Sequence, residues 1–316
     1  MPEGGSFMQQ LGRWFQSSRE VHLVCEIATD YVAAARFQQN SVEAWAVQAL
    51  PSGAVRPAPM AENIADLLTV QRALQQVVGA VGEGQRACVL LVPDLLARVA
   101  LLEFDQWPAR SEEAEGLLRW RLKKDLPFDV NQAAVSCHLQ AGRSTPHEVL
   151  AVASLRSLVH QYEACAEALG LQPGWVVPST LAALGCADGA TEGARLLVKR
   201  DQGSLSLAIV HNKNVRLFRS LPLGTAAGPE SDALFEKVYP ALVFFQDQWE
   251  QPLQEVLLLG LEQWEGRLAR RFKQETSCAA RSVDLAGHRL PADAASGQAA
   301  DHRIAPSLGW VLGEPA

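Results

Sequence analysis

One order of elements occurs twice along this chain of 316 residues, and that repetition limits the folds open to it. Each copy begins with three short strand-like runs separated by tight polar turns, which is typical of a β-meander. A helical pattern, a buried strand, a second helix and a short strand follow in both copies. The sequence therefore predicts two related lobes, each built on its own sheet.

The expected elements of the first copy are strands at 21–27, 31–38, 41–49, 87–92 and 175–177, and helices at 64–79, 155–169 and 179–184. Those of the second copy are strands at 194–199, 204–210, 214–218, 255–259 and 281–284, and helices at 231–248 and 262–275. Gly79 is expected to end its helix, because glycine readily takes the backbone of a helix C-terminus. Residues 287–301 are expected to form a surface excursion, and residues 304–313 a final apolar helix.

An insertion interrupts the first copy. It carries strand patterns at 99–104, 133–139 and 148–154 and one charged helix that begins near Ser111. We expect an N-terminal amphipathic segment at 1–18, a first lobe at 19–92 plus 155–190, an inserted α+β subdomain at 93–154, a second lobe at 191–303, and a helix at 304–316 that returns to the first lobe. A duplicated βββαβαβα unit is the plan of the actin-like ATPase fold, a two-lobed α/β fold of the RNase H-like type.

The charged helix of the insertion leads into a stiff apolar corner. Ser111 can cap the helix, and acidic residues in its first turn and basic residues in its last match the helix dipole at both ends. Pro127 is expected to stop the helix, and Phe128 to place an aromatic ring just beyond it. Core packing is the expected main role of Phe128. Trp120 lies off the apolar face of the helix and is a candidate contact for a partner.

Charge and composition argue against several function classes. With 28 basic and 35 acidic residues, a net charge of −7 and a pI near 5.6, the chain shows no basic footprint for nucleic acid. Its histidines and cysteines form no metal-binding pair, and no apolar run approaches the ~20 residues of a membrane span. Residues 7–15 form an amphipathic pattern, for which contact with a membrane surface, packing against protein and a frayed end all stay open.

Several segments, in order along almost the whole chain, resemble one family. The helix ending in LPFDV is similar to the corner of the family's small inserted subdomain, and VLAVASLRSLVHQYEACAEALGLQPGWVVPSTLAAL to its strand, long helix and following turn. FRSLPLG, DALFEKVYPALVFFQDQW, VLLLG and SLGWVLG continue the resemblance in the family's order. The family is the cytoplasmic type IV pilus assembly protein PilM, a relative of the division protein FtsA, and it implies the actin-like ATPase fold.

The resemblance locates three nucleotide loops, and the first departs from the family pattern. In the family this phosphate loop reads roughly D-I-G-s-s-s-i-K, whereas the aligned stretch EIATDYVA of this chain contains Glu26, Ala28, Thr29 and Asp30. Glu26 keeps a carboxylate. Ala28, however, adds a Cβ where the backbone must approach phosphate, and Asp30 adds a negative charge there.

The second and third loops are altered in the same sense. Where the family has D-i-G in its second phosphate loop, this chain has Lys199, Arg200 and Asp201, so a cation replaces the acid on the metal side. The third loop, usually a G-G pair that lines the adenosine, is Gly260-Leu261. These changes oppose ATP binding. We therefore expect a pseudo-ATPase without a cofactor, in which ATP and Mg²⁺ are disfavoured.

By resemblance, the leading expectation is a binding module and not an enzyme. Such a protein would lie in the cytoplasm at the periphery of the inner membrane and connect pilus motor components to a PilN-like membrane protein. It would hold that protein's N-terminal peptide in a groove between the inserted subdomain and the first lobe. Trp120, Leu126, Pro127 and Phe128 are the residues expected near the groove.

Two alternatives stay open. One is an active actin-like ATPase, whose loops would then align one or two residues away from the positions given above. The other is the cytoplasmic part of a type II secretion protein similar to GspL. That family continues into a membrane span, and this sequence reaches Ala316 without one, which favours the pilus interpretation.

Overall fold

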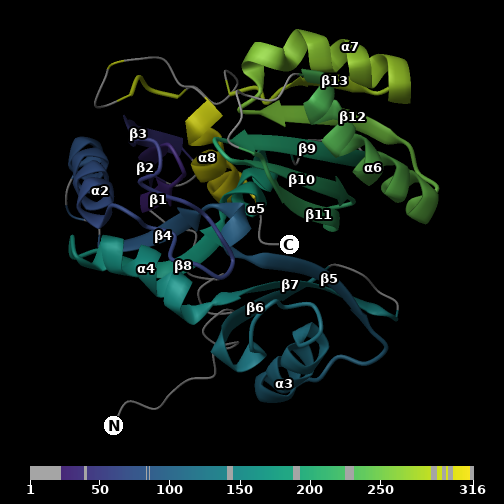
Figure 1. The fold of residues 1–316 in the computed structure, drawn as a ribbon, viewed down its shortest axis with the longest axis horizontal. Coiled ribbons are helices and arrows are strands. Elements are labelled where there is room, and N and C mark those ends of the chain that lie inside the picture. Colours follow the sequence, from purple (N-terminus) through teal and green to yellow (C-terminus); the bar gives the residue numbers. More distant parts are fainter. Residues whose placement is uncertain are drawn as a thin grey trace.

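Three sheets and the helices around them form two lobes and a smaller third body (Figure 1). The computed structural model describes residues 23–38, 41–82, 84, 86–140, 145–187, 193–224, 231–285, 290–293, 297 and 302–313. The predicted N-terminal segment 1–18, with its amphipathic pattern at 7–15, lies outside the described residues. Within the described part, no helix combines the length and apolar character needed to cross a membrane.

The two large sheets have the same strand order. The first consists of β1 (Leu23–Ile27), β2 (Tyr31–Gln38), β3 (Ser41–Ala49), β4 (Ala87–Val92) and β8 (Gln172–Pro178), in the order β3-β2-β1-β4-β8. The second consists of β9 (Ala194–Asp201), β10 (Ser204–His211), β11 (Asn214–Pro222), β12 (Leu253–Leu259) and β13 (Ala279–Ser282), in the order β11-β10-β9-β12-β13. In both, the meander is antiparallel and the last two strands run parallel to the central one. The duplication predicted from the sequence is confirmed.

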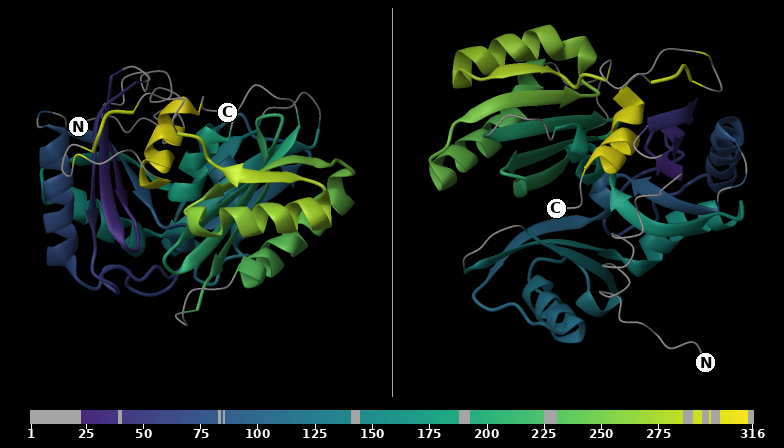
Figure 2. Two further views of the ribbon diagram at one scale, coloured as in Figure 1. Left: turned by 90° about the horizontal axis from the view of Figure 1, so that it is seen from above. Right: turned by 180° about the vertical axis from the view of Figure 1, so that it is seen from behind.

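Helices cover both faces of each sheet. α2 (Leu67–Val81) and α4 (Arg156–Glu167) pack on the outer face of the first sheet, where Leu74 and Tyr162 are buried. α6 (Ser231–Trp249) and α7 (Glu265–Thr276) do the same for the second sheet, and Phe235 and Phe272 meet there edge to face. α5 (Ser179–Ala183) and α8 (Ala305–Leu312) lie between the lobes and pack against apolar residues of both sheets (Figure 2).

The segment around α5 and α8 brings main chain against main chain. A Cβ on Gly309 of α8 would lie 2.5 Å from the carbonyl oxygen of Ala182 in α5, and a Cβ on Gly185, just after α5, would collide with the carbonyl of Gly309. Side chains cannot be accommodated at either position. Two glycines therefore set how closely these helices, and with them the lobes, approach each other.

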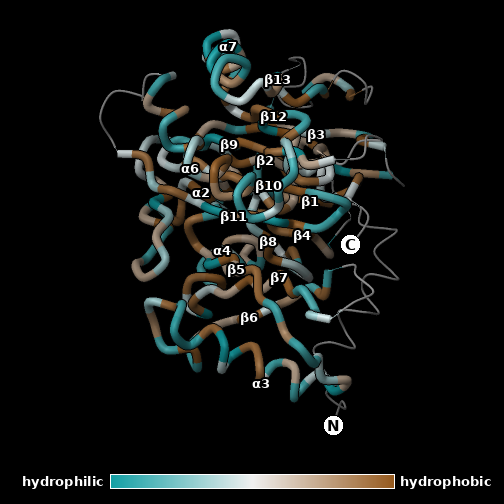
Figure 3. Tube along the Cα trace, turned by 90° about the vertical axis from the view of Figure 1, so that its right-hand side faces the viewer, coloured by the Kyte–Doolittle hydropathy of each residue, from teal (hydrophilic) through white to brown (hydrophobic). Residues whose placement is uncertain are grey.

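The inserted body is a three-stranded antiparallel sheet with one helix. Its strands β5 (Arg98–Phe104), β6 (Ala133–Leu139) and β7 (His147–Leu155) have the order β5-β7-β6, and α3 (Ser111–Leu122) covers one face. The opposite face is turned toward the lobes, where α4 contacts β6 and β7, and β11 contacts β5. Short 3₁₀ turns occur at η2 (Asp94–Leu96), η3 (Val130–Gln132), η4 (Leu184–Cys186), η5 (Glu262–Trp264) and η7 (His302–Ile304). Apolar residues concentrate in the strands, whereas α7 at the periphery is largely hydrophilic (Figure 3).

Some element boundaries differ from the predictions. α2 continues through Gly79 to Val81, because one glycine inside a helix costs only about 1 kcal/mol, and Gly82 with φ +100° follows it instead. Ser111 is the first residue of α3 and not its cap, and α3 ends four residues before Leu126, well short of Pro127. β13 begins two residues earlier than the predicted strand at 281–284.

The prediction of a surface excursion at 287–301 is wrong for residues 290–293, which the structure describes. Trp45 of β3 donates its indole N–H to the carbonyl oxygen of Pro291 at 2.7 Å, and the backbone N–H of Val47 donates to Asp293 Oδ2 at 3.0 Å. Asp293 is buried. Residues 290–293, which we call the interlobe strap, thus leave the second lobe and cover the edge strand of the first. The side chain of Asp293 satisfies an edge N–H that would otherwise be open.

Candidate functional site

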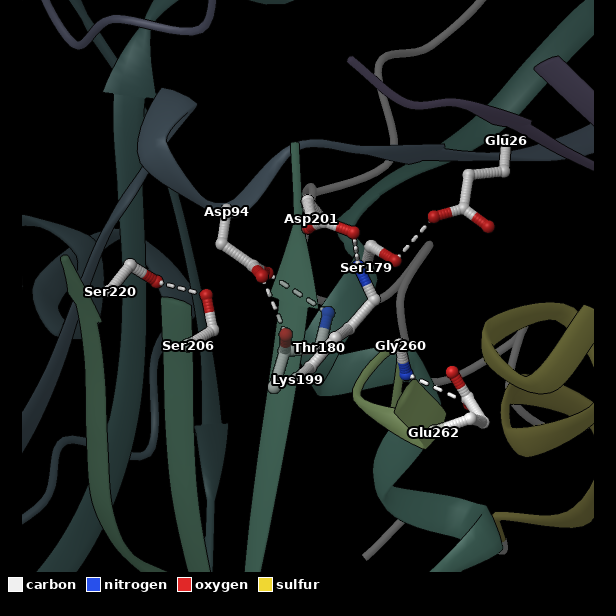
Figure 4. A network of polar contacts seen from close by, with 10 residues as sticks. All are labelled: Glu26, Asp94, Ser179, Thr180, Lys199, Asp201, Ser206, Ser220, Gly260 and Glu262. Carbon is white, nitrogen blue, oxygen red and sulfur yellow. Dashed lines mark hydrogen bonds and ion pairs between the residues drawn. The ribbon is translucent and has the colours of Figure 1, made fainter. Parts of the chain in front are cut away.

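The three loops that the sequence identifies lie together where the lobes meet (Figure 4). β1 leads into Ala28, Thr29 and Asp30, while β9 carries Lys199 and ends at Asp201. Burial raises the pKa of Asp30, and two charges from the other lobe also act on it, since Asp201 raises this pKa and Lys199 lowers it. The central strand of each duplicated sheet therefore ends at the same place, as strands of α/β sheets do at ligand sites.

Lys199 is buried in this site and forms an ion pair inside it. Its side chain is 3% exposed, and its Nζ lies 2.5 Å from Asp201 Oδ1. Burial alone would lower the pKa of the lysine, but the negative charges of Asp201, Glu26 and Asp94 outweigh that effect and raise it. The ammonium group is therefore charged and held among carboxylates that come from both lobes.

Glu26 faces Lys199 from the first lobe. Ser179, the first residue of α5, donates its hydroxyl to Glu26 Oε1 at 2.5 Å. Burial raises the pKa of Glu26 to about 7, although the charge of Lys199 and the hydrogen bond from Ser179 both act against the rise. The carboxyl group of Glu26 therefore binds a proton more readily than an exposed glutamate does.

Asp94 is a site residue that the sequence interpretation missed. It lies in η2, directly after β4, and accepts hydrogen bonds from the backbone N–H of Thr180 at 2.9 Å and from its hydroxyl at 2.5 Å. Burial raises the pKa of Asp94, while Lys199 lowers it. The available signal was its position at the carboxyl end of a parallel strand next to the central one.

The third loop packs directly against the second, with Gly260 beside the main chain of Arg200. Gly260 has φ +71°, and a Cβ there would collide with the carbonyl oxygen of Arg200, so only glycine fits. Leu261 is fully buried in the second core. Arg200 stacks its guanidinium 4.7 Å from the ring centroid of Trp264, which lies directly beyond this loop. The backbone of Gly260 therefore serves packing between two loops.

Groups of the first two loops are engaged by contacts within the chain. The backbone N–H of Ala28 donates to the carbonyl oxygen of Tyr31 at 2.9 Å, and its side chain is buried with Tyr31 and Ala33, so this group is committed to the β1–β2 turn. Lys199 places a fixed positive charge among the carboxylates that would otherwise coordinate a metal. In the described ranges, no cluster of three or more His, Cys, Asp or Glu side chains has the geometry to hold a metal ion.

The residues expected to contact a partner occupy different environments. Trp120 is 71% exposed on α3, as its position off the apolar face predicts. Leu126 is buried in the core of the insertion, and Phe128 is half-buried against that core. Pro127 between them is exposed. These four residues belong to the α3 side of the three-stranded sheet.

The other side of that sheet was not predicted. Ala100, Val135 and Ala151 pack toward α3, so their alternating neighbours point the other way, toward the lobes. His138, Leu150 and Leu101 stand side by side across the three strands on this second face. Leu101 is 37% exposed, and the other two are half-buried. Burial lowers the pKa of His138, which favours its neutral form. We call this surface, together with Val152, the inner sheet face.

Comparison with known proteins gives a fold but no close relative. No family model matches the chain, and no curated protein matches it. Among solved structures, a chain of a PilM–PilN type IV pilus biogenesis complex is similar with a TM-score of 0.75 and 15% identity, over 94% of this chain and 99% of that one. The cytoplasmic domain of EpsL, an inner membrane component of the type II secretion system of Vibrio cholerae, has a TM-score of 0.48 and 14% identity, over 75% of this chain and 81% of that one.

A Bacteroides thetaiotaomicron protein described as having an actin-like ATPase fold has a TM-score of 0.49 and 11% identity, over 84% of this chain and 92% of that one. The similarity to the pilus complex extends over both lobes and the insertion, because it covers nearly all of both chains. The chain therefore has the actin-like ATPase fold in the form seen in the PilM–PilN complex, as its resemblance to the PilM family predicts.

Proposed function

We propose that this chain is a non-catalytic scaffold of a type IV pilus assembly machinery. The observation that carries the proposal is the buried ammonium group of Lys199, which lies between carboxylates of both lobes at the place where the resemblance puts a metal-side acid. The chain's own cation neutralises the cleft, so the lobes stay together without a nucleotide. The similarity of fold to the PilM–PilN complex supports the pilus assignment.

The electrostatics of the cleft support the proposal that nucleotide binding is disfavoured. A divalent cation would meet the fixed charge of Lys199, and a triphosphate would meet the carboxylate of Asp30 in the first loop. Each like-charge contact costs several kcal/mol in a partly buried site, which exceeds the binding energy of a weak nucleotide ligand. Scaffolding thus needs no reaction step from this site.

We further propose that the partner is the N-terminal cytoplasmic peptide of a PilN-like inner-membrane protein, and that pilus motor components bind to the same scaffold. The complex formed would keep the chain in the cytoplasm, at the periphery of the inner membrane. An extended peptide between the inserted subdomain and the first lobe would meet the inner sheet face, where Leu101 and Leu150 are paired across β5 and β7 and Glu103 and Glu148 form the next pair on the same face. Trp120, Pro127 and Phe128 lie on the α3 side of the same sheet, and their contact with the peptide stays a prediction.

Two titrations test the proposal. In the first, isothermal titration calorimetry with Mg-ATP at millimolar concentration is expected to give no saturable heat, and an ATPase assay no turnover above buffer. Saturable binding with turnover would support the alternative of an active actin-like ATPase.

In the second titration, a fluorescent peptide with the N-terminal sequence of a PilN-like protein from the same organism is expected to bind, as measured by anisotropy. Leu150→Asp should abolish the binding, because it places a charge on the inner sheet face. Gln48→Ala, an exposed substitution on β3, is the control. Equal binding by both variants would remove the inner sheet face from the proposal.

A further inference from the structure

The outer surface of the second lobe carries an apolar stripe on α6. Tyr239 and Val243 are each 39% exposed and Phe244 is 55% exposed, although the opposite side of the same helix is core. Exposed Pro240 lies one turn from both Val243 and Phe244, so these four side chains are contiguous on the helix. We call them the α6 stripe. Contiguous exposed apolar groups of this kind are typical of protein contact sites.

An acidic hollow adjoins the stripe at the end of the helix. It has a volume of about 450 Å³ and is lined by Gln246, Asp247, Glu250, Gln251 and Pro252. Asp247 follows Val243 by one helical turn, so the hollow continues the line of the stripe. Among the described residues, no ion pair is formed by Asp247 or Glu250, and the carbonyl groups at the C-terminus of α6 add negative potential.

Neighbouring cations leave this negative charge in place. Arg216 lies 4.4 Å from the ring centroid of Trp249, but it is paired with Glu148 of the inserted subdomain. Arg271 pairs with Glu236, which lies one turn before Tyr239 and Pro240 on α6, and with Glu275 of α7. The hollow therefore presents two carboxylates to solvent beside an apolar surface.

We propose that the α6 stripe and the acidic hollow together bind an amphipathic segment of a second protein partner. Apolar side chains of that segment lie over Val243 and Phe244, and a lysine or arginine about one turn further on enters the hollow between Asp247 and Glu250. Charge complementarity selects this occupant. An anionic membrane surface would be repelled by the two carboxylates, and a purely apolar segment would leave them unpaired.

This site and the proposed peptide site lie on different bodies of the fold, which meet where Arg216 contacts Trp249 of α6 and pairs with Glu148 of β7. α6 belongs to the second lobe, whereas the inner sheet face belongs to the inserted subdomain, and Figure 1 shows α6 and α3 at different ends of the molecule. The chain would thus hold two partners at once, which a scaffold requires and a single groove does not allow.

Selection from a phage-displayed library of random peptides tests the proposal, with the full chain as the bait. The expected peptides combine two or three apolar residues at helical spacing with a lysine or arginine. Their affinity should fall about tenfold or more in Phe244→Ser and in Asp247→Lys. Leu68→Ser, at a residue of α2 that is 63% exposed, is the matched control and should bind like the unchanged chain.

Charge reversal separates this site from non-specific adhesion. Asp247→Lys/Glu250→Lys should lose the basic peptides and bind versions in which glutamate replaces their lysines or arginines. Equal loss in Leu68→Ser, no enrichment of basic residues, or binding of anionic vesicles that Phe244→Ser weakens would each overturn the proposal. A concentration-dependent dimer in sedimentation velocity that Phe244→Ser abolishes would assign the stripe to a second copy of the chain and overturn it as well.

Discussion

At the scale of single residues, the cleft between the lobes is organised by one cation and its carboxylate neighbours. The ammonium group of Lys199, on a strand of the second lobe, attracts the carboxyl groups of Glu26 and Asp94 in the first lobe. Ser179 and Thr180 orient those two carboxyl groups by hydrogen bonds. Buried ion pairs add little stability when compared with apolar packing, but removal of one partner is costly because the other stays buried and charged. The effect of each charged group on stability is therefore best measured by substituting that group alone.

Lys199→Met is expected to destabilise the chain by about 3–5 kcal/mol, because it leaves the carboxylate of Asp201 buried without a cation. Lys199→Met/Asp201→Asn should recover part of that loss. Chemical denaturation measures both, and Lys123→Met at an exposed position should change stability by less than about 0.5 kcal/mol. An unchanged midpoint for Lys199→Met would show that its ammonium does not neutralise the cleft.

The raised pKa of Glu26 predicts how the stability of the folded chain depends on pH. Burial raises its pKa from 4.5 to about 7, so the folded chain holds a proton that the unfolded chain releases, and stability falls as the pH rises from 4.5 to 7. Glu26→Gln should remove this fall and raise stability at pH 8 by up to about 3 kcal/mol. Thermal melts across this pH range provide the measurement. Glu62→Gln, at an exposed position, should keep the pH dependence of the unchanged chain.

At the scale of elements, the sequence predicts the strands better than their connections. Strand patterns such as 31–38 and 41–49 are matched by β2 and β3, because short runs of strand-forming residues bounded by polar turns are a local signal. The interlobe strap could not be predicted. Its composition is that of a loop, and Pro291 and Asp293 are each 246 residues away in the sequence from their partners on β3. Asp94 was not predicted for a related reason, because its partner Thr180 lies in α5, far from it in the sequence.

The candidate site was predicted only in part. Glu26, Lys199 and Asp201 were identified from their loops, and the structure brings them together. Their burial, which decides the pKa of Glu26 and the charge balance of Lys199, depends on how the lobes pack and has no local signal. The placement of the PilN-like peptide near Trp120 and Phe128 stays a prediction.

The side chain of Gln140 joins the inserted subdomain to the second lobe. Its amide pairs with both backbone groups of one residue, as a neighbouring strand would. Gln140 donates its amide to the carbonyl oxygen of Val215 at 3.1 Å and accepts the N–H of Val215 at 2.6 Å. Gln140→Ala leaves both backbone groups unpaired and is expected to cost about 1–3 kcal/mol. Hydrogen exchange should become faster at Val215 in this variant, whereas Gln48→Ala should leave it unchanged. Unaltered protection of Val215 would mean that the contact with Gln140 is not maintained in solution.

At the scale of the whole molecule, three connections fix how the lobes lie relative to each other. The attraction of Lys199 to Glu26 and Asp94 forms the first, α5 and α8 with their two glycines the second, and the interlobe strap the third. In an actin-like fold that works on nucleotide, the cleft would have to admit a ligand. Here each connection is built from the chain's own groups, which agrees with a scaffold.

Gly309→Ala tests the second connection. Its methyl group would lie 2.5 Å from the carbonyl oxygen of Ala182, so α8 has to move and the lobes separate slightly, at an expected cost of at least about 1–3 kcal/mol. Gly116→Ala is the control, because a Cβ there meets nothing within 4 Å in α3 and should stabilise by about 1 kcal/mol. Small-angle scattering and thermal melts check both; equal melting of the two variants would contradict the close contact.

The inserted subdomain rests on both lobes at once, on α4 at one side and on β11 at the other, where Arg216 pairs with Glu148. A tether attached to this subdomain would transmit tension along two routes instead of one. The load on each route is then smaller, and neither lobe is levered away from its neighbour. Such a mount agrees with the scaffold proposed above, in which a partner is bound at the inserted subdomain.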